Sequence, residues 1–241
     1  MRMARARPSS PLLLGHRGAS KYAPENTFAA FDLALAHGCD GFEFDVRYTS
    51  DRRAILCHDP AIDGLLIEDS TYPTLVQNRQ NSAESSSREL RQEDPSFLPC
   101  LEDVLRKYHS VRYLDIELKV RGMEEDVVRL LTTAPPAGEY LVSSFLPAAL
   151  LRLHEICPEL PLGVIGDTSE AFVAVQRLPV SVAFAHYPLI TKEFVEECRS
   201  RSLQVVAWTA NDRAEMMRLA ALGVEGIISD DTELLCNTLR K

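Results

Sequence analysis

Short apolar segments recur along this chain and alternate with longer segments whose apolar residues repeat at helical spacing. Runs of this length, rich in β-branched and aromatic residues, favour buried strands. Because strands and helices alternate over 241 residues, the pattern predicts an α/β fold with a parallel sheet, closed as a barrel or open. The predicted strands are Leu12–Gly15, Gly41–Tyr48, Ala54–His58, Tyr113–Leu118, Tyr140–Ser143, Leu162–Ile165, Val182–Ala185, Gln204–Trp208 and Gly226–Ser229.

Helix signals fill most of the intervals between these strands. One helical segment follows Asn26 and stops at Gly38, and another follows Asp212 and stops at Gly223. Asn and Asp are favoured N-cap residues, and glycine commonly ends a helix. Glu215 lies three residues after Asp212, as in a capping box. We therefore expect Asn26 and Asp212 to cap these two helices.

The nine predicted strands exceed by one the eight of a (β/α)8 barrel. Only the five residues TSDRR separate the second strand from the third, whereas a parallel crossover needs a dozen or more. The third strand must therefore turn back antiparallel on the second as a hairpin, which leaves eight barrel strands. In this hairpin we expect Arg47 to face Ala54, Asp45 to face Leu56 or Cys57, and Glu43 to lie near His58.

A long polar segment from Pro60 to Pro99 interrupts the rhythm of strands and helices, with NRQNSAESSSRELRQEDPS inside it. Connections of this length are uncommon in compact domains, so the segment is a lid, a small subdomain or partly disordered. We expect a single domain over residues 1–241, with an insertion at about residues 60–98.

Composition limits the classes of function. A formal net charge of −9 argues against a general nucleic-acid binder. There is no run of 18 apolar residues, so no membrane insertion is expected. The basic start MRMARARPSSP lacks the apolar core of a secretion signal and is expected to be a short leader. Six cysteines without close pairs predict reduced thiols in a cytoplasmic protein: Cys39, Cys57, Cys100, Cys157, Cys198 and Cys236.

Two cationic residues and a glycine end the first predicted strand, in LLLGHRGAS. A chain that needed only to fold would rarely place His16 and Arg17 at the end of a buried strand. Gly18 allows a sharp turn or a close approach of the backbone to a ligand. The planar guanidinium of Arg17 is suited to holding two oxygens of a phosphate.

The second strand, GFEFDVRY, has two chemically distinct faces. Its apolar face suits the outside of a barrel, which helices cover, so the polar face turns inward. Adjacent buried carboxylates repel each other unless a cation lies between them. All-oxygen ligands of this kind suit Mg²⁺ or Ca²⁺. The apolar face is Phe42, Phe44 and Val46, and the inward face is Glu43, Asp45 and Arg47.

The fourth predicted strand, in YLDIELKV, follows the same design. Glu117 and Lys119 share one face, and Asp115 lies deeper on it. The Glu117–Lys119 pair is either a simple ion pair or part of a site in which Glu117 joins Glu43 and Asp45 around a metal while Lys119 meets an anion.

These residues together resemble the glycerophosphodiester phosphodiesterases. The resemblance begins at HRGASKYAPENTFAAFDLALAHGCDGFEFDVRYTSDRRAILCHD and continues through FLPCLEDVL, LDIELK, LVSSF, VVAWTAN and GIISDD, in order and over nearly the whole chain. It implies a TIM (β/α)8 barrel. It also implies a divalent metal, Mg²⁺ or Ca²⁺, an acid–base pair and two phosphate-holding cations. The implied metal ligands are Glu43, Asp45 and Glu117; the acid–base pair is His16 and His58; the cations are Arg17 and Lys119.

The chemistry of a phosphodiester needs these residue types. Its anionic charge repels nucleophiles, and a metal with cationic side chains neutralises the charge that grows in the transition state. Two imidazoles, with ordinary pKa values of about 6.5, can hold opposite protonation states near neutral pH. The family resemblance suggests the glycerol 2-hydroxyl as nucleophile, and the sequence leaves open which histidine is the base.

Several further positions have two interpretations. Trp208 either stacks on the glycerol moiety or caps the core. His186, Asp230 and the pair Ser144–Phe145 also end strands, where they line a pocket or serve the structure. Glu25 is expected near the rim of the site. After His58, the segment PAIDGLLIEDSTYPTL lacks the Arg-Thr pair of many family members and is unusually apolar.

Three functional hypotheses follow. The first is metal-dependent hydrolysis of small glycerophosphodiesters to sn-glycerol 3-phosphate and an alcohol. The second is lysophospholipase D-type cleavage of a lipid phosphodiester, which the apolar segment after His58 keeps open. The third is a barrel that binds phosphodiesters without cleaving them; the presence of His16 and His58 speaks against it. The partner is a small molecule in the first case, and the sequence does not indicate an oligomeric state.

Overall fold

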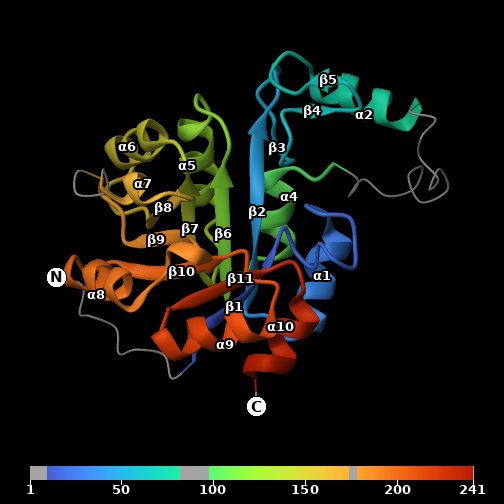
Figure 1. Cartoon of the computed structure of the whole chain (residues 1–241). Helices are drawn as coiled ribbons and strands as arrows, with labels where there is room; N and C mark the ends of the chain where they lie inside the picture. The colour runs from blue at the N-terminus through green and yellow to red at the C-terminus, as the bar shows by residue number, and fades with distance from the viewer. Residues whose placement is uncertain (1–9, 82–97, 174–177, 241) are drawn as a thin grey trace.

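Eight parallel strands close into a barrel in the computed structural model (Figure 1), which describes residues 10–81, 98–173 and 178–240. Each strand pairs with the next, and β1 closes the ring by pairing with both β2 and β11. The barrel prediction is confirmed. The barrel strands are β1 (Leu12–His16), β2 (Gly41–Tyr48), β6 (Tyr113–Leu118), β7 (Glu139–Ser144), β8 (Leu162–Gly166), β9 (Val182–His186), β10 (Gln204–Trp208) and β11 (Gly226–Ser229).

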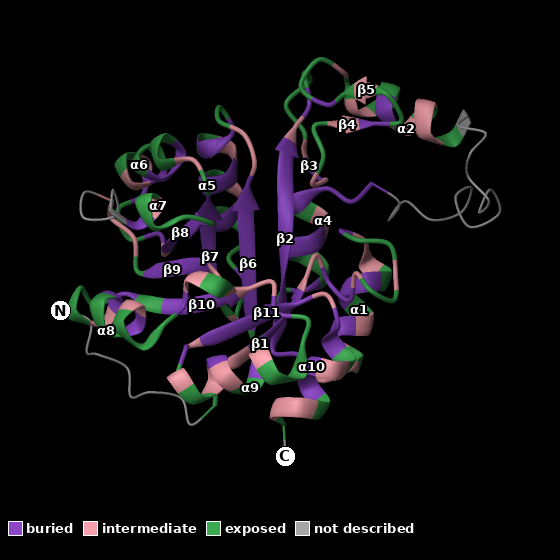
Figure 2. Ribbon diagram, in the orientation of Figure 1, coloured by how far each residue is buried: buried purple, intermediate pink, exposed green. Residues whose placement is uncertain are grey.

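Helices connect these strands and surround the barrel (Figure 1). In Figure 2 the strands are largely buried, whereas the helices also present exposed surface. The helices are α1 (Phe28–Ala36), α4 (Leu101–Lys107), α5 (Glu124–Thr133), α6 (Pro147–Ile156), α7 (Ser169–Val173), α8 (Lys192–Ser200), α9 (Arg213–Leu222) and α10 (Thr232–Leu239), with a 3-10 turn η3 at Tyr187–Leu189. Among the described residues, none of the helices has the length and apolar character that crossing a membrane requires.

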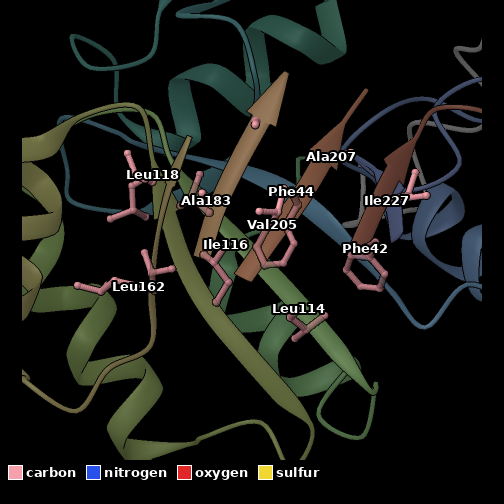
Figure 3. Close-up of a cluster of buried hydrophobic side chains, with 14 of the residues drawn as sticks. Phe42, Phe44, Leu114, Ile116, Leu118, Leu162, Ala183, Val205, Ala207 and Ile227 are labelled. Atoms are coloured by element: carbon pink, nitrogen blue, oxygen red, sulfur yellow. The ribbon is translucent and has the colours of Figure 1, made fainter. Parts of the chain in front are cut away.

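The two faces of each strand belong to two different cores. Outward residues such as Phe42, Phe44 and Ile116 pack under the helices (Figure 3). A second apolar cluster fills the inside of the barrel, and it is formed by Leu14, Tyr113, Leu141, Ile165, Val182, Phe184, Val206 and Ile228. Because side chains alternate along a strand, the residue two positions after each inner apolar residue also faces inward, one layer higher. On β2 and β6 the inward side chains above this cluster are polar, as predicted: Glu43 pairs in register with Asp115, and Asp45 pairs with Glu117.

The predicted hairpin is confirmed as strand β3 (Ala54–Leu56), antiparallel to β2. Its register differs by one residue from the expected one, because Tyr48 rather than Arg47 pairs with Ala54. The turn closes with Thr49 N–H donating to the Arg53 carbonyl at 3.0 Å. Cys57 N–H donates to the Asp45 carbonyl at 3.2 Å, in agreement with one of the expected pairings.

The described part of the insertion forms a small unit of its own. It contains β4 (Ala61–Ile62), β5 (Leu65–Leu66) and α2 (Tyr72–Asn81), which lie beyond the arrowhead of β2 in Figure 1. A separate apolar cluster joins it to the hairpin, and the buried members are Ile55, Ile62, Ile67, Leu75, Leu98 and Cys100. Residues 82–97 of the predicted insertion, and residues 1–9 of the predicted leader, lie outside the described residues.

The predicted N-cap of α9 is confirmed, whereas that of α1 is not. Asp212 caps α9 by accepting from Ala214 N at 2.8 Å and from Glu215 N at 3.2 Å, and Gly223 ends the helix at φ 77°. The prediction that Asn26 caps α1 is wrong. Thr27 is the N-cap, with its hydroxyl accepting from Ala30 N, while Asn26 is buried and turned toward β2.

Candidate active site

Three buried carboxylates meet at the carboxyl-terminal mouth of the barrel. Glu43 and Asp45 project inward from β2 and Glu117 from the neighbouring β6, where Asp45 and Glu117 are paired in register. One carboxylate oxygen from each residue lies within 4.8 Å of the others. Their exposed fractions are 3%, 1% and 7%, respectively. The predicted cluster is therefore assembled, and its all-oxygen donor set has the chemistry that Mg²⁺ and Ca²⁺ prefer.

The electrostatics of this cluster call for a cation. Burial raises the pKa of Glu43 well above its usual range, and the charges of Asp45 and Glu117 raise it further. Burial also raises the pKa of Glu117, with Asp45 as the next cause. Among the described residues, Glu43 Oε1 has no hydrogen-bond partner although it is buried. An unsatisfied buried carboxylate oxygen costs free energy unless a donor or metal ion meets it.

Two basic side chains partly balance the cluster. Lys119 Nζ lies 2.7 Å from Glu117 Oε1 and 3.3 Å from Asp45 Oδ1. Arg17 Nε lies 3.1 Å from Asp45 Oδ2. Burial raises the pKa of Asp45, but Lys119 and Arg17, together with the Asn26 hydrogen bond and the charge of His58, lower it by more, so the pKa lies below its usual value. Asp45 is therefore the member of the cluster most firmly held in its ionised form.

The loop after β1 turns its backbone toward the same cluster. Arg17 has a left-handed φ of 54° and Gly18 a φ of 83°. This conformation directs Arg17 N–H to Glu43 Oε2 at 2.9 Å. A Cβ on Gly18 would lie 2.6 Å from the backbone of Ala30, so glycine is required for the loop to pack on α1. Arg17 also ion-pairs with Glu25 at the rim, at 2.9 Å.

Asn26 braces Asp45, a role that the sequence did not reveal. Its side-chain nitrogen donates to Asp45 Oδ2 at 2.9 Å, and its side-chain oxygen accepts from Asp45 N at 3.1 Å. The Asn26 side-chain amide thus hydrogen-bonds both the carboxylate and the backbone N–H of Asp45. The sequence signal for this loop is the segment PENT, which is part of the stretch that resembles the family.

His16 is held by a carboxylate from the opposite end of the chain. Its Nδ1 lies 2.6 Å from Asp230 Oδ1, just after β11, and its Nε2 lies 3.9 Å from Glu43 Oε2. Asp230 also accepts from Ser20 and Asn211. Burial raises the pKa of Asp230, but the hydrogen bond from His16 and the charge of His16 lower it by more, to about 2. Asp230 therefore stays ionised at neutral pH and holds the His16 ring through Nδ1.

His58 reaches the site because β3 lies along the edge of β2 that β1 leaves open. β1 ends at His16, which pairs with Glu43. β3 pairs with the later residues of β2, and the chain then runs back toward the end of β1. Burial raises the pKa of Asp45, and Lys119, Arg17 and the Asn26 hydrogen bond lower it. The charge of His58 lowers it as well. His58 is 37% exposed on its side chain, and its Nδ1 lies 3.0 Å from Asp59 Oδ1.

Aromatic side chains form another wall of the mouth. Trp208 donates its indole N–H to the Phe184 carbonyl at 3.1 Å, so it is anchored to the barrel while remaining half-buried. Its ring meets Phe145 edge-on at 5.6 Å and lies 5.4 Å from His186. Lys119 Nζ lies 5.7 Å from the centre of the Phe145 ring, which connects this wall to the carboxylates.

A cavity of about 570 Å³ opens beside His16 on the side of β11. Its lining is polar and charged, in contrast to the aromatic wall. The lining residues are His16, Arg17, Ser20, Lys21, Glu25, Asn211, Asp230 and Asp231. Lys21 pairs with Asp231 at 2.5 Å, so the cavity wall is itself cross-linked by ion pairs.

Asp115, expected deeper on the face of Glu117, pairs in register with Glu43, below the pair of Asp45 and Glu117. It is 1% exposed, and its Oδ1 accepts from the Ser143 hydroxyl at 2.6 Å. Burial raises its pKa well above the usual range. The charge of Asp115 raises the pKa of Glu43, but Asp115 is not one of the three residues whose carboxylate oxygens lie within 4.8 Å of one another.

Comparison with known proteins gives a consistent family. A model of the glycerophosphoryl diester phosphodiesterase family matches residues 16–234. The YhdW protein of Bacillus subtilis is 32% identical over 236 residues, which cover 90% of this chain and 93% of that protein. A protein of Caldanaerobacter subterraneus named glycerophosphodiester phosphodiesterase is 28% identical, over 95% of this chain and 98% of its own.

Solved structures with the same fold extend this comparison. A phosphodiesterase of Oleispira antarctica, crystallised with the product sn-glycerol-3-phosphate, has a TM-score of 0.79 and 25% identity, covering 95% of this chain and 96% of that one. The Thermotoga maritima glycerophosphodiester phosphodiesterase has a TM-score of 0.75 and 23% identity, covering 96% of this chain and 99% of that one.

We predict that Mg²⁺ or Ca²⁺ stabilises the folded protein through the carboxylate cluster. A ligand at 100 times its Kd adds about 2.7 kcal/mol of stability, which for a chain of this size raises Tm by roughly 5–11 °C. Glu43→Gln removes a charged ligand and a repulsion, so its metal-free Tm is expected to equal or exceed the wild-type value while the metal response is lost. Differential scanning calorimetry in EDTA and in added metal measures both effects.

The matched control is Glu159→Gln, an exposed position before β8 at the other end of the barrel. It is expected to keep the full metal response. An undiminished response in Glu43→Gln would place the metal elsewhere.

Proposed function

The chain belongs to the glycerophosphoryl diester phosphodiesterase family, and we propose that it hydrolyses glycerophosphodiesters to sn-glycerol 3-phosphate and an alcohol in a metal-dependent reaction. The observation that carries the proposal is the meeting of three buried carboxylates within 4.8 Å, beside His16, at the mouth of the barrel. The Oleispira relative, described with sn-glycerol-3-phosphate as its product, supports the same product for this chain.

Glu43, Asp45 and Glu117 are the residues that would hold the metal. The cluster fits a divalent ion because it is buried, all-oxygen and includes an unsatisfied atom, Glu43 Oε1, among the described residues. When bound, Mg²⁺ or Ca²⁺ supplies positive charge that polarises a phosphoryl oxygen and offsets the negative charge developing in the transition state.

Arg17 and Lys119 hold the phosphate in this proposal. Both cations border the carboxylates, with Arg17 Nε 3.1 Å from Asp45 and Lys119 Nζ 2.7 Å from Glu117. Arg17 can present its planar donors to two phosphate oxygens, whereas Lys119 supplies a point charge. Trp208, beside Phe145, is proposed to pack against the glycerol carbons.

His16 and His58 act as the acid–base pair. One imidazole takes the proton of the attacking hydroxyl, and the other protonates the departing alcohol. Asp230 orients His16 through Nδ1, which leaves Nε2 turned toward Glu43 and the site. The fixed Asp230 charge stabilises the imidazolium that forms when His16 holds a proton.

The nucleophile in this proposal is the glycerol 2-hydroxyl. It is already tethered to the phosphate, and such an arrangement can contribute roughly 7–11 kcal/mol to lowering the barrier. Its attack gives a cyclic phosphate, which water then opens to sn-glycerol 3-phosphate.

A cytoplasmic location fits the thiol content. All six cysteines are free, and five of them are buried. Proteins that fold in oxidising compartments commonly pair their cysteines as disulfides.

Product release from a panel of diesters tests the reaction class. We expect sn-glycerol 3-phosphate from glycerophosphocholine in the presence of Mg²⁺ or Ca²⁺, no product in EDTA, and recovery when excess metal is added. An enzyme-coupled assay of sn-glycerol 3-phosphate measures this. Turnover of lysophosphatidylcholine alone would favour the lysophospholipase D alternative, and binding without turnover would favour the non-catalytic one. Full activity in EDTA would contradict the metal dependence.

Replacing either histidine by alanine is expected to lower kcat by about 10²–10⁴. The double variant should be little worse than the worse single variant, since the two residues act in one step. His109→Ala is the matched control, because His109 is exposed and follows α4 at the other end of the barrel. Steady-state kinetics on folded variants decides the matter, and near wild-type kcat in both single variants would refute the assignment.

A substrate analogue without the 2-hydroxyl tests the nucleophile. We predict that it binds with similar affinity but is not cleaved, and that phosphorus NMR of the normal reaction detects glycerol 1,2-cyclic phosphate at early times. Competitive inhibition by the analogue verifies that it occupies the site. Rapid cleavage of the analogue would instead indicate attack by water, which would leave the residue set in place and reassign one histidine.

A further inference from the structure

Arg47 is an inward-facing residue of β2 that the proposed mechanism does not use. It follows Asp45 by two residues and is 9% exposed, which is unusual for a guanidinium. Its Nε donates to the His58 carbonyl at 2.9 Å. Its Nη1 lies 3.0 Å from Glu68 Oε1, in the insertion after β5. One buried side chain therefore joins the metal-cluster strand to the loop of a candidate catalytic histidine.

The loop that carries His58 has little regular support of its own. β3 ends at Leu56, so the ladder with β2 stops before the histidine. Within the described residues, β2 then holds this part of the backbone by two hydrogen bonds: Cys57 N–H donates to the Asp45 carbonyl at 3.2 Å, and Arg47 donates to the His58 carbonyl. Both contacts come from β2, the strand that also supplies Glu43 and Asp45.

We propose that Arg47 is a positioning residue that sets the place of the His58 imidazole relative to the metal cluster. The proposal rests on the function proposed above, in which His58 transfers a proton. The guanidinium is planar and its donors diverge at fixed angles. The ion pair of Nη1 with Glu68 therefore fixes the direction in which Nε points, and Nε fixes the His58 carbonyl.

Proton transfer requires this kind of support, because a displacement of about 1 Å at a reacting group can cost on the order of 10²-fold in rate. His58 is 37% exposed on its side chain, and its other polar contact is the 76% exposed Asp59. A surface pair of this type orients a side chain weakly. The buried Arg47 contact to the backbone is the firmer constraint on His58.

The test is the effect of Arg47→Met measured in two backgrounds. In the wild-type background we expect kcat for glycerophosphocholine to fall between about 10- and 100-fold, with KM changed by less than about threefold. In the His58→Ala background we expect no further loss beyond about twofold, since Arg47 acts through His58 and coupled residues are not additive. A structural role, or direct contact of Arg47 with the phosphate, predicts the same loss in both backgrounds and overturns the inference.

Companion variants keep the test decisive. Arg47→Lys retains charge beside Glu68 but not the planar fork, so its kcat should lie between those of wild type and Arg47→Met. Glu68→Gln keeps a hydrogen-bond acceptor for Arg47 and is expected to lose less than about threefold. Circular dichroism and Tm establish folding, and if Arg47→Met does not fold, Arg47→Lys is compared in the two backgrounds instead.

The matched control is Arg53→Met, on the same hairpin. Arg53 contacts Cys100 Sγ at 3.6 Å and lies over the Tyr72 ring, so its loss disturbs packing against the insertion without touching His58. It should leave kcat within about threefold of wild type. If His58→Ala itself retains wild-type kcat, the proposed role of His58 fails. If His58→Ala is impaired but the Arg47→Met loss persists in that background, the inference on Arg47 alone fails.

Discussion

Repulsion among three buried carboxylates is the constraint around which the mouth of this barrel is arranged. Glu43, Asp45 and Glu117 are each at most 7% exposed; Asp45 and Glu117 raise the pKa of Glu43, and Asp45 raises that of Glu117. Such a cluster persists only where surrounding groups hold it in place. Lys119 and Arg17 supply partial neutralisation at Asp45, and the apolar cluster inside the barrel supports the layer from below.

Strand β2 positions the residues that surround this cluster. Its outward residues Phe42 and Phe44 pack in the apolar core beneath the helices (Figure 3). This packing keeps the opposite face of the strand turned toward the inside of the barrel. Along its length it pairs with β1, β6 and β3. Each neighbour delivers one component: His16 comes from the end of β1, Glu117 from β6 and His58 from the chain after β3. The geometry of the candidate site is thus set largely by the hydrogen-bond register of β2 with its neighbours.

Much of this arrangement follows from local rules in the sequence. Two-residue alternation separates the faces of β2, and a five-residue link excludes a parallel crossover. The features that sequence reasoning missed depend on distant partners. Asn26 and Thr27 are both good N-cap residues, and a contact with Asp45, nineteen positions away, decides that Asn26 is not the cap. The contact of His16 with Asp230 spans 214 positions and exists only because β1 closes on β11. The predicted hairpin register differs by one residue from the observed one, because the residue types of the turn do not determine its geometry.

The two histidines of the proposed acid–base pair differ in their surroundings. The Nδ1 atom of His16 lies 2.6 Å from Asp230. Burial raises the pKa of Asp230, but the hydrogen bond and charge of His16, with the hydrogen bonds of Asn211 and Ser20, lower it by more, to about 2, so this carboxylate is ionised at neutral pH. The Nδ1 atom of His58 lies 3.0 Å from Asp59, which is 76% exposed, so water screens the charge of this carboxylate. Two imidazoles in identical environments would compete for a proton equally. Here the fold places His16 against a partly buried carboxylate that Ser20 and Asn211 also hold, and His58 against a solvent-exposed one, so the two histidines differ in their surroundings before substrate binds.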